Sequence, residues 1–272
     1  MKLFIQSHLL IVSFVFLFGS CAIEDHLRPA NPNCHLDKVV EKFQVTDGSN
    51  PEEMIEIEGQ KIPISTTPNS SIAYKYDPQG RVIEKHQNRY IYYYEYLPNN
   101  DIKWVAVPDP SLPYSTSTTG TFILDSQGLF SNAANRFDSE GFRVFYNEGT
   151  WKLESTITNG NVSKTVRNET RSEATTEYEY DLTQPNKIPN PEPHFGKVSR
   201  NMLVRQKYKI IDSNGSGYYI LTEFKYVYDL NGQVKSLIGV NNKYGFDKDY
   251  NIDYTTKSDT YYTIIDYTIT CQ

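Results

Sequence analysis

The sequence is poor in positive charge and has no basic cluster. It contains 27 Lys and Arg residues against 33 Asp and Glu residues, which gives a formal net charge of −6 and a pI near 5.5. Nucleic-acid binding depends on lysine and arginine side chains that neutralise phosphates. We therefore expect no nucleic-acid partner.

Motifs for nucleotide binding, nucleophilic catalysis and metal binding are also missing. The sequence has no G-x-x-x-x-G-K-[ST] or G-x-G-x-x-G phosphate-binding loop and no G-x-S-x-G nucleophile motif. Its three cysteines and five histidines show no C-x-x-C or H-x-x-x-H spacing of the kind that holds zinc. We expect neither a metal nor a cofactor, and no catalytic residue is assigned.

Only one long apolar run is present, and it lies near the N-terminus. It extends from Leu9 to Phe18, follows Met1-Lys2 and precedes Gly19-Ser20-Cys21. The run is short for a membrane span of about 20 residues, and its flanks are those of a secretory signal. This N-terminus resembles the signal peptide and lipobox of bacterial lipoproteins, with Phe18 in place of the usual leucine.

The lipoprotein resemblance implies a processed and anchored protein. Residues 1–20 would be the signal peptide, and Cys21 would be acylated, which would make the membrane a partner of the mature chain. Ala22 follows Cys21 where an aspartate would suggest inner-membrane retention, so we expect the outer membrane. The periplasmic and the surface-exposed orientation both stay open, and a plain secretory signal is the alternative.

The two other cysteines lie near the ends of the mature chain. Once the lipid has consumed Cys21, Cys34 and Cys271 form an even pair in an oxidising compartment. We predict a disulfide between them that joins the N-terminal segment to the last strand. The alternative is two independent thiols.

Alternating apolar and aromatic residues predict an all-β protein. The sequence contains 22 Tyr, a residue that favours strands, and no window of about ten residues has helical periodicity. Residues 21–35 are expected to form a tether, and residues 36–272 a single curved antiparallel meander or partial barrel of consecutive hairpins. The expected strands include 38–45, 52–58, 90–96, 102–107, 142–146, 151–157, 162–166, 175–180, 203–211, 218–228 and 260–270.

A repeated unit supports the hairpins. Residues 74–82 and 226–234 share the pattern Y-x-Y-D-x-x-G-x-V, and residues 137–144 are a looser copy. An aspartate can cap the backbone at the first position of a turn, while glycine accepts the positive φ that closes it. We assign turn-forming roles to Asp77, Gly80, Asp138, Gly141, Asp229 and Gly232.

These units resemble the YD repeats of RHS-type bacterial surface proteins. A closer resemblance, carried by residues 178–181, 185–187, 196–204 and 226–234, is to a family of uncharacterised Gram-negative lipoproteins with a porin-like fold. Together with the last strand and a weaker copy near residue 74, it covers about two thirds of the mature chain. The family implies a curved or barrel-like sheet and an envelope location, but no activity.

Aromatic residues are the only feature that suggests ligand contact. Tyr90, Tyr92, Tyr94 and Tyr96 alternate along one strand and share a face. Together with Trp104 and Trp151 they could form a binding platform for sugars or a protein, or they could fill the core of the sheet. Residues 184–197 are expected to form a long loop, with four prolines and His194 beside Phe195.

The sequence therefore predicts a lipid-anchored envelope protein that binds a glycan or another envelope protein without catalysis. Two alternatives stay open. One is an enzyme that acts on polysaccharide with paired carboxylates, whose separation a sequence does not reveal. The other is a structural component of an outer-membrane assembly.

Overall fold

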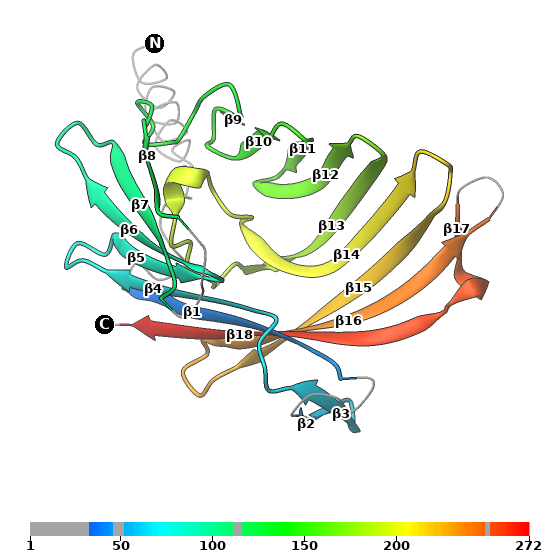
Figure 1. Ribbon diagram of the computed structural model, residues 1–272. Helices are drawn as coiled ribbons and strands as arrows, with labels where there is room; N and C mark the ends of the chain where they lie inside the picture. The colour runs from blue at the N-terminus through cyan, green and yellow to red at the C-terminus, as the bar shows by residue number, and fades with distance from the viewer. Residues whose placement is uncertain (1–32, 46–51, 111–115, 248–250, 272) are drawn as a thin grey trace, which may run out of the picture.

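The computed structural model describes residues 33–45, 52–110, 116–247 and 251–271, and most of them belong to β-strands (Figure 1). The predicted signal peptide, Cys21 and nearly all of the tether lie outside these residues. The sheet strands are β1 (Cys34–Phe43), β4 (Ser70–Tyr76), β5 (Val82–Gln87), β6 (Tyr90–Tyr96), β7 (Ile102–Pro108), β8 (Thr118–Phe122), β9 (Asn135–Phe137), β10 (Arg143–Asn147), β11 (Trp151–Thr158), β12 (Asn161–Glu169), β13 (Ser172–Pro185), β14 (Asn201–Asp212), β15 (Gly217–Tyr228), β16 (Val234–Phe246), β17 (Ile252–Asp253) and β18 (Asp259–Cys271). The remaining elements are the hairpin β2 (Glu52–Ile57) with β3 (Gln60–Ser65) and the short 3₁₀-helices η1 (Pro193–Phe195) and η2 (Tyr254–Thr256).

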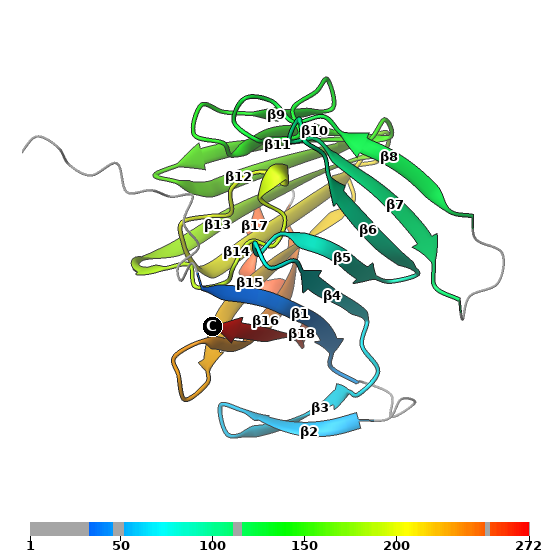
Figure 2. The same cartoon turned by 90° about the vertical axis from the view of Figure 1, so that its left-hand side faces the viewer.

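The 16 sheet strands form one antiparallel sheet that is not closed into a barrel. Its order is β8-β7-β6-β5-β4-β1-β18-β16-β15-β14-β13-β12-β11-β10-β9, with β17 paired to β16. Figures 1 and 2 show that the sheet curls strongly, which brings its end strands β8 and β9 to the same side. The predicted all-β, curved antiparallel fold is confirmed.

The sheet differs from a plain meander at one place. The first strand, β1, lies between β4 and the last strand, β18, and pairs with both. The first and last strands of the described residues therefore pair in the middle of the sheet.

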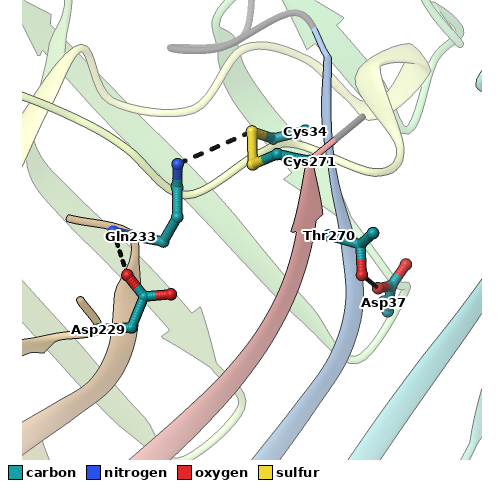
Figure 3. The surroundings of a disulfide bond; sticks show 6 residues. All are labelled: Cys34, Asp37, Asp229, Gln233, Thr270 and Cys271. Atoms are coloured by element: carbon teal, nitrogen blue, oxygen red, sulfur yellow. Dashed lines mark hydrogen bonds between the residues drawn. A yellow bond between two sulfur atoms is a disulfide. The ribbon is translucent and has the colours of Figure 1, made fainter. Parts of the chain in front are cut away.

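The predicted disulfide is confirmed and lies at this meeting point (Figure 3). Cys34 and Cys271 are direct partners in the β1–β18 register, and their Cα atoms lie 4.0 Å apart. Because the bond closes a loop with a sequence separation of 237 residues, it restricts the unfolded chain strongly. Native disulfides of this kind contribute about 2–5 kcal/mol to stability.

A small hydrophobic core lies on the convex side of the sheet. Figure 1 shows the β2–β3 hairpin on the convex side of the sheet. Its Ile57, Ile62 and Ile64 side chains form a buried cluster with Ile264 of β18. Since successive residues of a strand face opposite sides, the neighbours of Ile264, Thr263 and Ile265, face the concave side.

Away from the hairpin, the convex side carries ion pairs. Arg205 of β14 contacts Glu179 of β13 at 2.9 Å and Glu223 of β15 at 3.2 Å, and Lys207 also contacts Glu179.

No helix in the described part of the chain is long and apolar enough to cross a membrane.

Four tyrosines stabilise bends in the sheet at the end that holds the disulfide. Each hydroxyl donates to a backbone carbonyl of the neighbouring strand, and that carbonyl belongs to the residue just before the extra residue of a β-bulge. The pairs are Tyr76 with Leu36, Tyr96 with Val82, Tyr180 with Val162 and Tyr226 with Leu203, at O···O distances of 2.7, 3.1, 2.8 and 2.9 Å. A bulge disrupts the ladder locally and bends the strand, so these hydroxyls satisfy acceptors where the sheet curves.

Burial keeps these tyrosines protonated. It raises the pKa of Tyr96 and of Tyr226 to about 12, and each hydroxyl therefore remains a donor over the physiological range.

We predict that Tyr226→Phe lowers the free energy of unfolding by about 1–3 kcal/mol, because the Leu203 carbonyl loses its donor. Urea denaturation measures the change. The matched control is Tyr93→Phe, whose ring is 45% exposed on the convex side and which should change stability by less than about 0.5 kcal/mol. Equal effects of the two substitutions would contradict the structural role of the bulge contacts.

Candidate functional site

The concave face has a hollow lined by both polar and apolar residues near its centre, with a volume of about 210 Å³. Strands β14, β15, β16, β18 and β1 supply its walls. The lining residues are Glu41, Gln206, Thr222, Phe224, Leu237, Gly239, Asn241, Thr263 and Ile265. We call this group the central hollow.

The hollow exists because β16 has a glycine at its floor. Gly239 pairs with Phe224 of β15 on one side and with Thr263 of β18 on the other. A Cβ at Gly239 would lie 3.3 Å from the Thr222 methyl carbon and 3.5 Å from the Phe224 ring. Any larger side chain would therefore occupy the space between these neighbours.

A fixed hydrogen-bond network forms the polar side of the central hollow. Thr222 and Asn241 are only 4% and 7% exposed, and the Thr222 hydroxyl donates to the Asn241 amide oxygen at 2.8 Å. The Asn241 amide nitrogen donates to the Gly239 carbonyl at 3.2 Å and to the Thr263 hydroxyl at 3.0 Å. These bonds hold the threonine hydroxyls in place beside the Phe224 ring.

One carboxylate borders the central hollow. Glu41 of β1 accepts a hydrogen bond from the Asn69 amide at 3.3 Å. The Gln206 amide lies on the opposite wall and can both donate and accept. Amide, hydroxyl and carboxylate groups around an aromatic ring are suited to a ligand with many hydroxyl groups and an apolar face.

The predicted aromatic row lies on the concave side, next to the long loop between β13 and β14. Tyr94 donates to Glu192 at 3.1 Å, and Tyr96 donates to the Val82 carbonyl as described above. Tyr92 lies 6.4 Å from Trp104, and Tyr90 lies 6.3 Å from Tyr92, between ring centroids. None of these residues lines the central hollow.

The sixth predicted aromatic residue, Trp151, lies elsewhere. It lines a second hollow of about 380 Å³ at the opposite end of the concave face from the disulfide. The structure therefore does not bring the six predicted aromatic residues together.

The loop at residues 186–200 folds into the curl of the sheet, where Figures 1 and 2 show its short helix η1. Its predicted start at residue 184 is two residues too early, because β13 continues to Pro185. Glu192 forms an ion pair with Lys85 of β5 at 2.7 Å, and both side chains are largely buried. The backbone amide of Phe130, in the segment between β8 and β9, donates to the His194 carbonyl at 2.9 Å.

Glycine is required at one point of this loop. Gly196 has a φ of +106°, and a Cβ there would lie 2.9 Å from the Phe137 ring of β9. The close approach lets the loop pack against the strand at the end of the sheet.

His194 is buried in an aromatic cluster at the tip of the loop. Its ring centroid lies 5.4 Å from that of Phe122 and 4.3 Å from that of Phe195, and its Nε2 atom has no hydrogen-bond partner. Burial lowers the pKa of His194 to about 4, against a small opposing effect of Glu192. The structure therefore holds this histidine in its neutral form.

The assigned aspartates each occupy the first position of a turn. Asp77, Asp138 and Asp229 accept two backbone amide hydrogen bonds each, from the residues two and four positions later. The matching glycines, Gly80, Gly141 and Gly232, have φ angles of +77°, +90° and +75°.

Sequence reasoning missed the residues of the central hollow. One signal was available, since a glycine inside the alternating run 234–246 is typical of close backbone approach or a vacant position on a sheet face. No three His, Cys, Asp or Glu side chains in the described ranges are grouped as metal ligands.

We predict that His194 makes stability depend on pH between about 6.5 and 4. The unfolded chain binds a proton at His194 near pH 6.5, and the folded chain only near pH 4. The free energy of unfolding should therefore fall as the pH drops through this window, by up to about 3 kcal/mol. His194→Leu keeps an apolar side chain in the cluster and should remove this part of the pH dependence in urea titrations. Identical pH profiles for the two proteins would contradict the prediction.

No protein-family model matches this sequence, and no curated protein matches it. Among solved structures, the chain is similar to a porin-like protein from Bacteroides uniformis, with a TM-score of 0.44 and 12% identity over 86% of this chain and 98% of that one. A porin-like protein from Bacteroides vulgatus gives a TM-score of 0.29 and 12% identity, over 85% and 97% of the two chains. Both are described as porin-like, as in the resemblance drawn from the sequence. The lipoprotein family and the RHS-type repeats stay predictions.

Proposed function

We propose that this chain is a lipid-anchored protein of the bacterial cell envelope whose concave face binds a glycan without cleaving it. The observation that carries the proposal is the central hollow, where hydroxyl and amide groups surround the Phe224 ring above Gly239. Sugars offer the complementary surface, because their hydroxyl groups exchange hydrogen bonds and their C–H faces pack on aromatic rings.

The shape and chemistry of the hollow favour a glycan over a protein partner. Protein interfaces have an apolar centre that excludes water. The central hollow instead combines the apolar side chains Phe224, Leu237 and Ile265 with the polar groups of Gln206, Thr222, Asn241 and Thr263. Its threonine and asparagine side chains are already held by hydrogen bonds, so little conformational entropy is lost when a ligand binds.

The acid content of the hollow favours binding over hydrolysis. A glycosidase needs two carboxyl groups about 5–9.5 Å apart across the sugar. The lining of the central hollow supplies Glu41 alone. A single carboxylate favours a binding role over the polysaccharide-cleaving alternative.

The proposed anchor is consistent with the way the sheet begins. The sequence pattern at residues 1–21 supports acylation of Cys21, and the sheet starts at Cys34. Because the disulfide joins Cys34 to the last strand, a short tether would hold the first and last strands, in the middle of the sheet, close to the membrane.

We predict that Gly239→Leu abolishes glycan binding while the sheet stays folded. The leucine side chain would fill the space between Phe224 and Thr263, and affinity for glycans identified on an array should fall at least about tenfold. Gly239→Ala is the matched control, because a single Cβ meets its neighbours at 3.3–3.7 Å and leaves most of the hollow open. Unchanged affinity in the leucine variant, or no glycan bound by the wild type, would refute the proposal.

We predict that Cys21→Ser releases the protein from membranes. In a Gram-negative host, the wild type should incorporate a labelled palmitate analogue and enter the detergent phase of Triton X-114. The Cys21→Ser variant should do neither, whereas Cys34→Ser serves as the matched cysteine control and should keep the label. Absence of label in the wild type would contradict the lipid anchor.

A further inference from the structure

The second hollow combines a tryptophan with two arginines. Its lining comes from the β10–β11 turn, the first residue of β11, the end of β12 and the β12–β13 turn. The lining residues are Thr150, Trp151, Arg167, Glu169, Thr170 and Arg171. We call this group the Trp151 hollow.

Contacts on two sides fix the tryptophan ring. The Arg167 guanidinium carbon lies 4.6 Å from the centroid of the Trp151 ring, and the Tyr146 ring meets it edge-on at 5.2 Å. Glu169, the register partner of Trp151, forms an ion pair with Arg167 at 2.7 Å. The Arg167 guanidinium therefore lies over one face of the Trp151 ring, and both groups line the hollow.

The charge of the Trp151 hollow is positive although the whole chain is negative. Arg167 and Arg171 outnumber the single carboxylate of Glu169 among the lining residues. Arg171 is exposed in the β12–β13 turn. A guanidinium group binds carboxylates with two parallel hydrogen bonds, which favours an acidic ligand over a neutral one.

The two hollows lie on the same face. Trp151 of β11 and Arg167 of β12 lie on the same face of the sheet as Thr165. Thr165 pairs with Thr176 of β13, which pairs with Tyr208 of β14, so this face continues to β14. Tyr208 lies two residues along β14 from Gln206 of the central hollow. The charges of Arg167 and Glu169 also act on the Tyr208 hydroxyl, whose pKa is raised chiefly by burial.

The separation of the hollows suits a short oligosaccharide. Arg167 of β12 and Gln206 of β14 are two strands apart, which corresponds to about 10 Å across the sheet at the usual strand spacing. The register row of Arg167 reaches β14 at Ile210, four residues or about 13 Å along the strand from Gln206. Tyr208, with Tyr218 at a centroid distance of 6.2 Å, forms an aromatic surface beside this path.

We propose that the Trp151 hollow is a subsite for a carboxylate-bearing sugar, and that the ligand is an acidic glycan that extends from it to the central hollow. This inference rests on the proposed glycan-binding function. The face of Trp151 that Arg167 does not cover would stack on the sugar ring, and Arg167 and Arg171 would bind its carboxylate.

Calorimetry on the full chain in detergent tests the inference. The probes are oligogalacturonates of defined length, oligomers of mannuronate, guluronate and glucuronate, and the carboxyl-reduced neutral form of each. At least one acidic series should bind about tenfold more tightly than its neutral form, and added salt should weaken that preference. Neutral forms that bind as tightly as the acidic ones would overturn the inference while leaving glycan binding intact.

Amino-acid substitutions test which residues cause the preference for acidic over neutral ligands. Arg167→Gln and Arg171→Gln should lower acidic-ligand affinity about tenfold and neutral-ligand affinity less than about twofold. Trp151→Ala should weaken both, and Trp151→Phe should restore part of the loss. Arginine variants with an unchanged acidic preference would overturn the subsite. Acidic binding that survives Gly239→Leu would overturn the single ligand across both hollows, and no binding by any probe would refute the proposed function as well.

Discussion

The curvature of this protein depends on a hydrogen bond that occurs four times, from a tyrosine hydroxyl to the carbonyl that precedes a β-bulge on the next strand. A bulge bends a strand but disrupts the ladder, so the carbonyl beside it needs another donor where water is scarce. Tyrosine supplies this donor at the end of a long apolar ring, which packs along the sheet before its hydroxyl reaches the neighbouring strand. Without these bends the sheet would be flatter, and neither hollow would face an enclosed concave side. The high tyrosine content of the sequence thus has a structural use in addition to any ligand contact.

Two further devices hold the curved sheet together where strand pairing does not. The disulfide joins β1 to β18, so the first and last strands are cross-linked in the middle of the sheet. The β13–β14 loop crosses the concave side, where Glu192 contacts β5 and β6, and the His194 carbonyl accepts from Phe130 between β8 and β9. In a closed barrel, strand pairing would join the two edge strands of the sheet. Here the loop supplies some of those contacts instead. The rest of the concave face stays accessible, which is where both hollows lie.

The sequence reveals the local structure of this fold better than its curvature. Alternation predicts most strands, and the D-x-x-G pattern at Asp77, Asp138 and Asp229 predicts turns, because both depend on residues close together in the chain. The pair Cys34–Cys271 follows from counting cysteines and from compartment chemistry. The ion pair between Lys85 and Glu192 joins residues 107 positions apart, and no local pattern connects them. The central hollow is similar, since it depends on Gly239 lying between Phe224 and Thr263 of two other strands, a register that alternation within one strand does not reveal.

A net charge of −6 does not oppose an acidic ligand at the Trp151 hollow. At physiological ionic strength the Debye length is about 8 Å, so charges on the convex face and in distant turns are largely screened at the concave surface. Many of the convex charges are also neutralised locally, as in the contacts of Glu179 with Arg205 and Lys207. What a bound carboxylate experiences is the nearest set, Arg167, Arg171 and Glu169, which is positive. The overall charge sets solubility and long-range repulsion, whereas the preference for a ligand is set by the few groups within hydrogen-bonding reach.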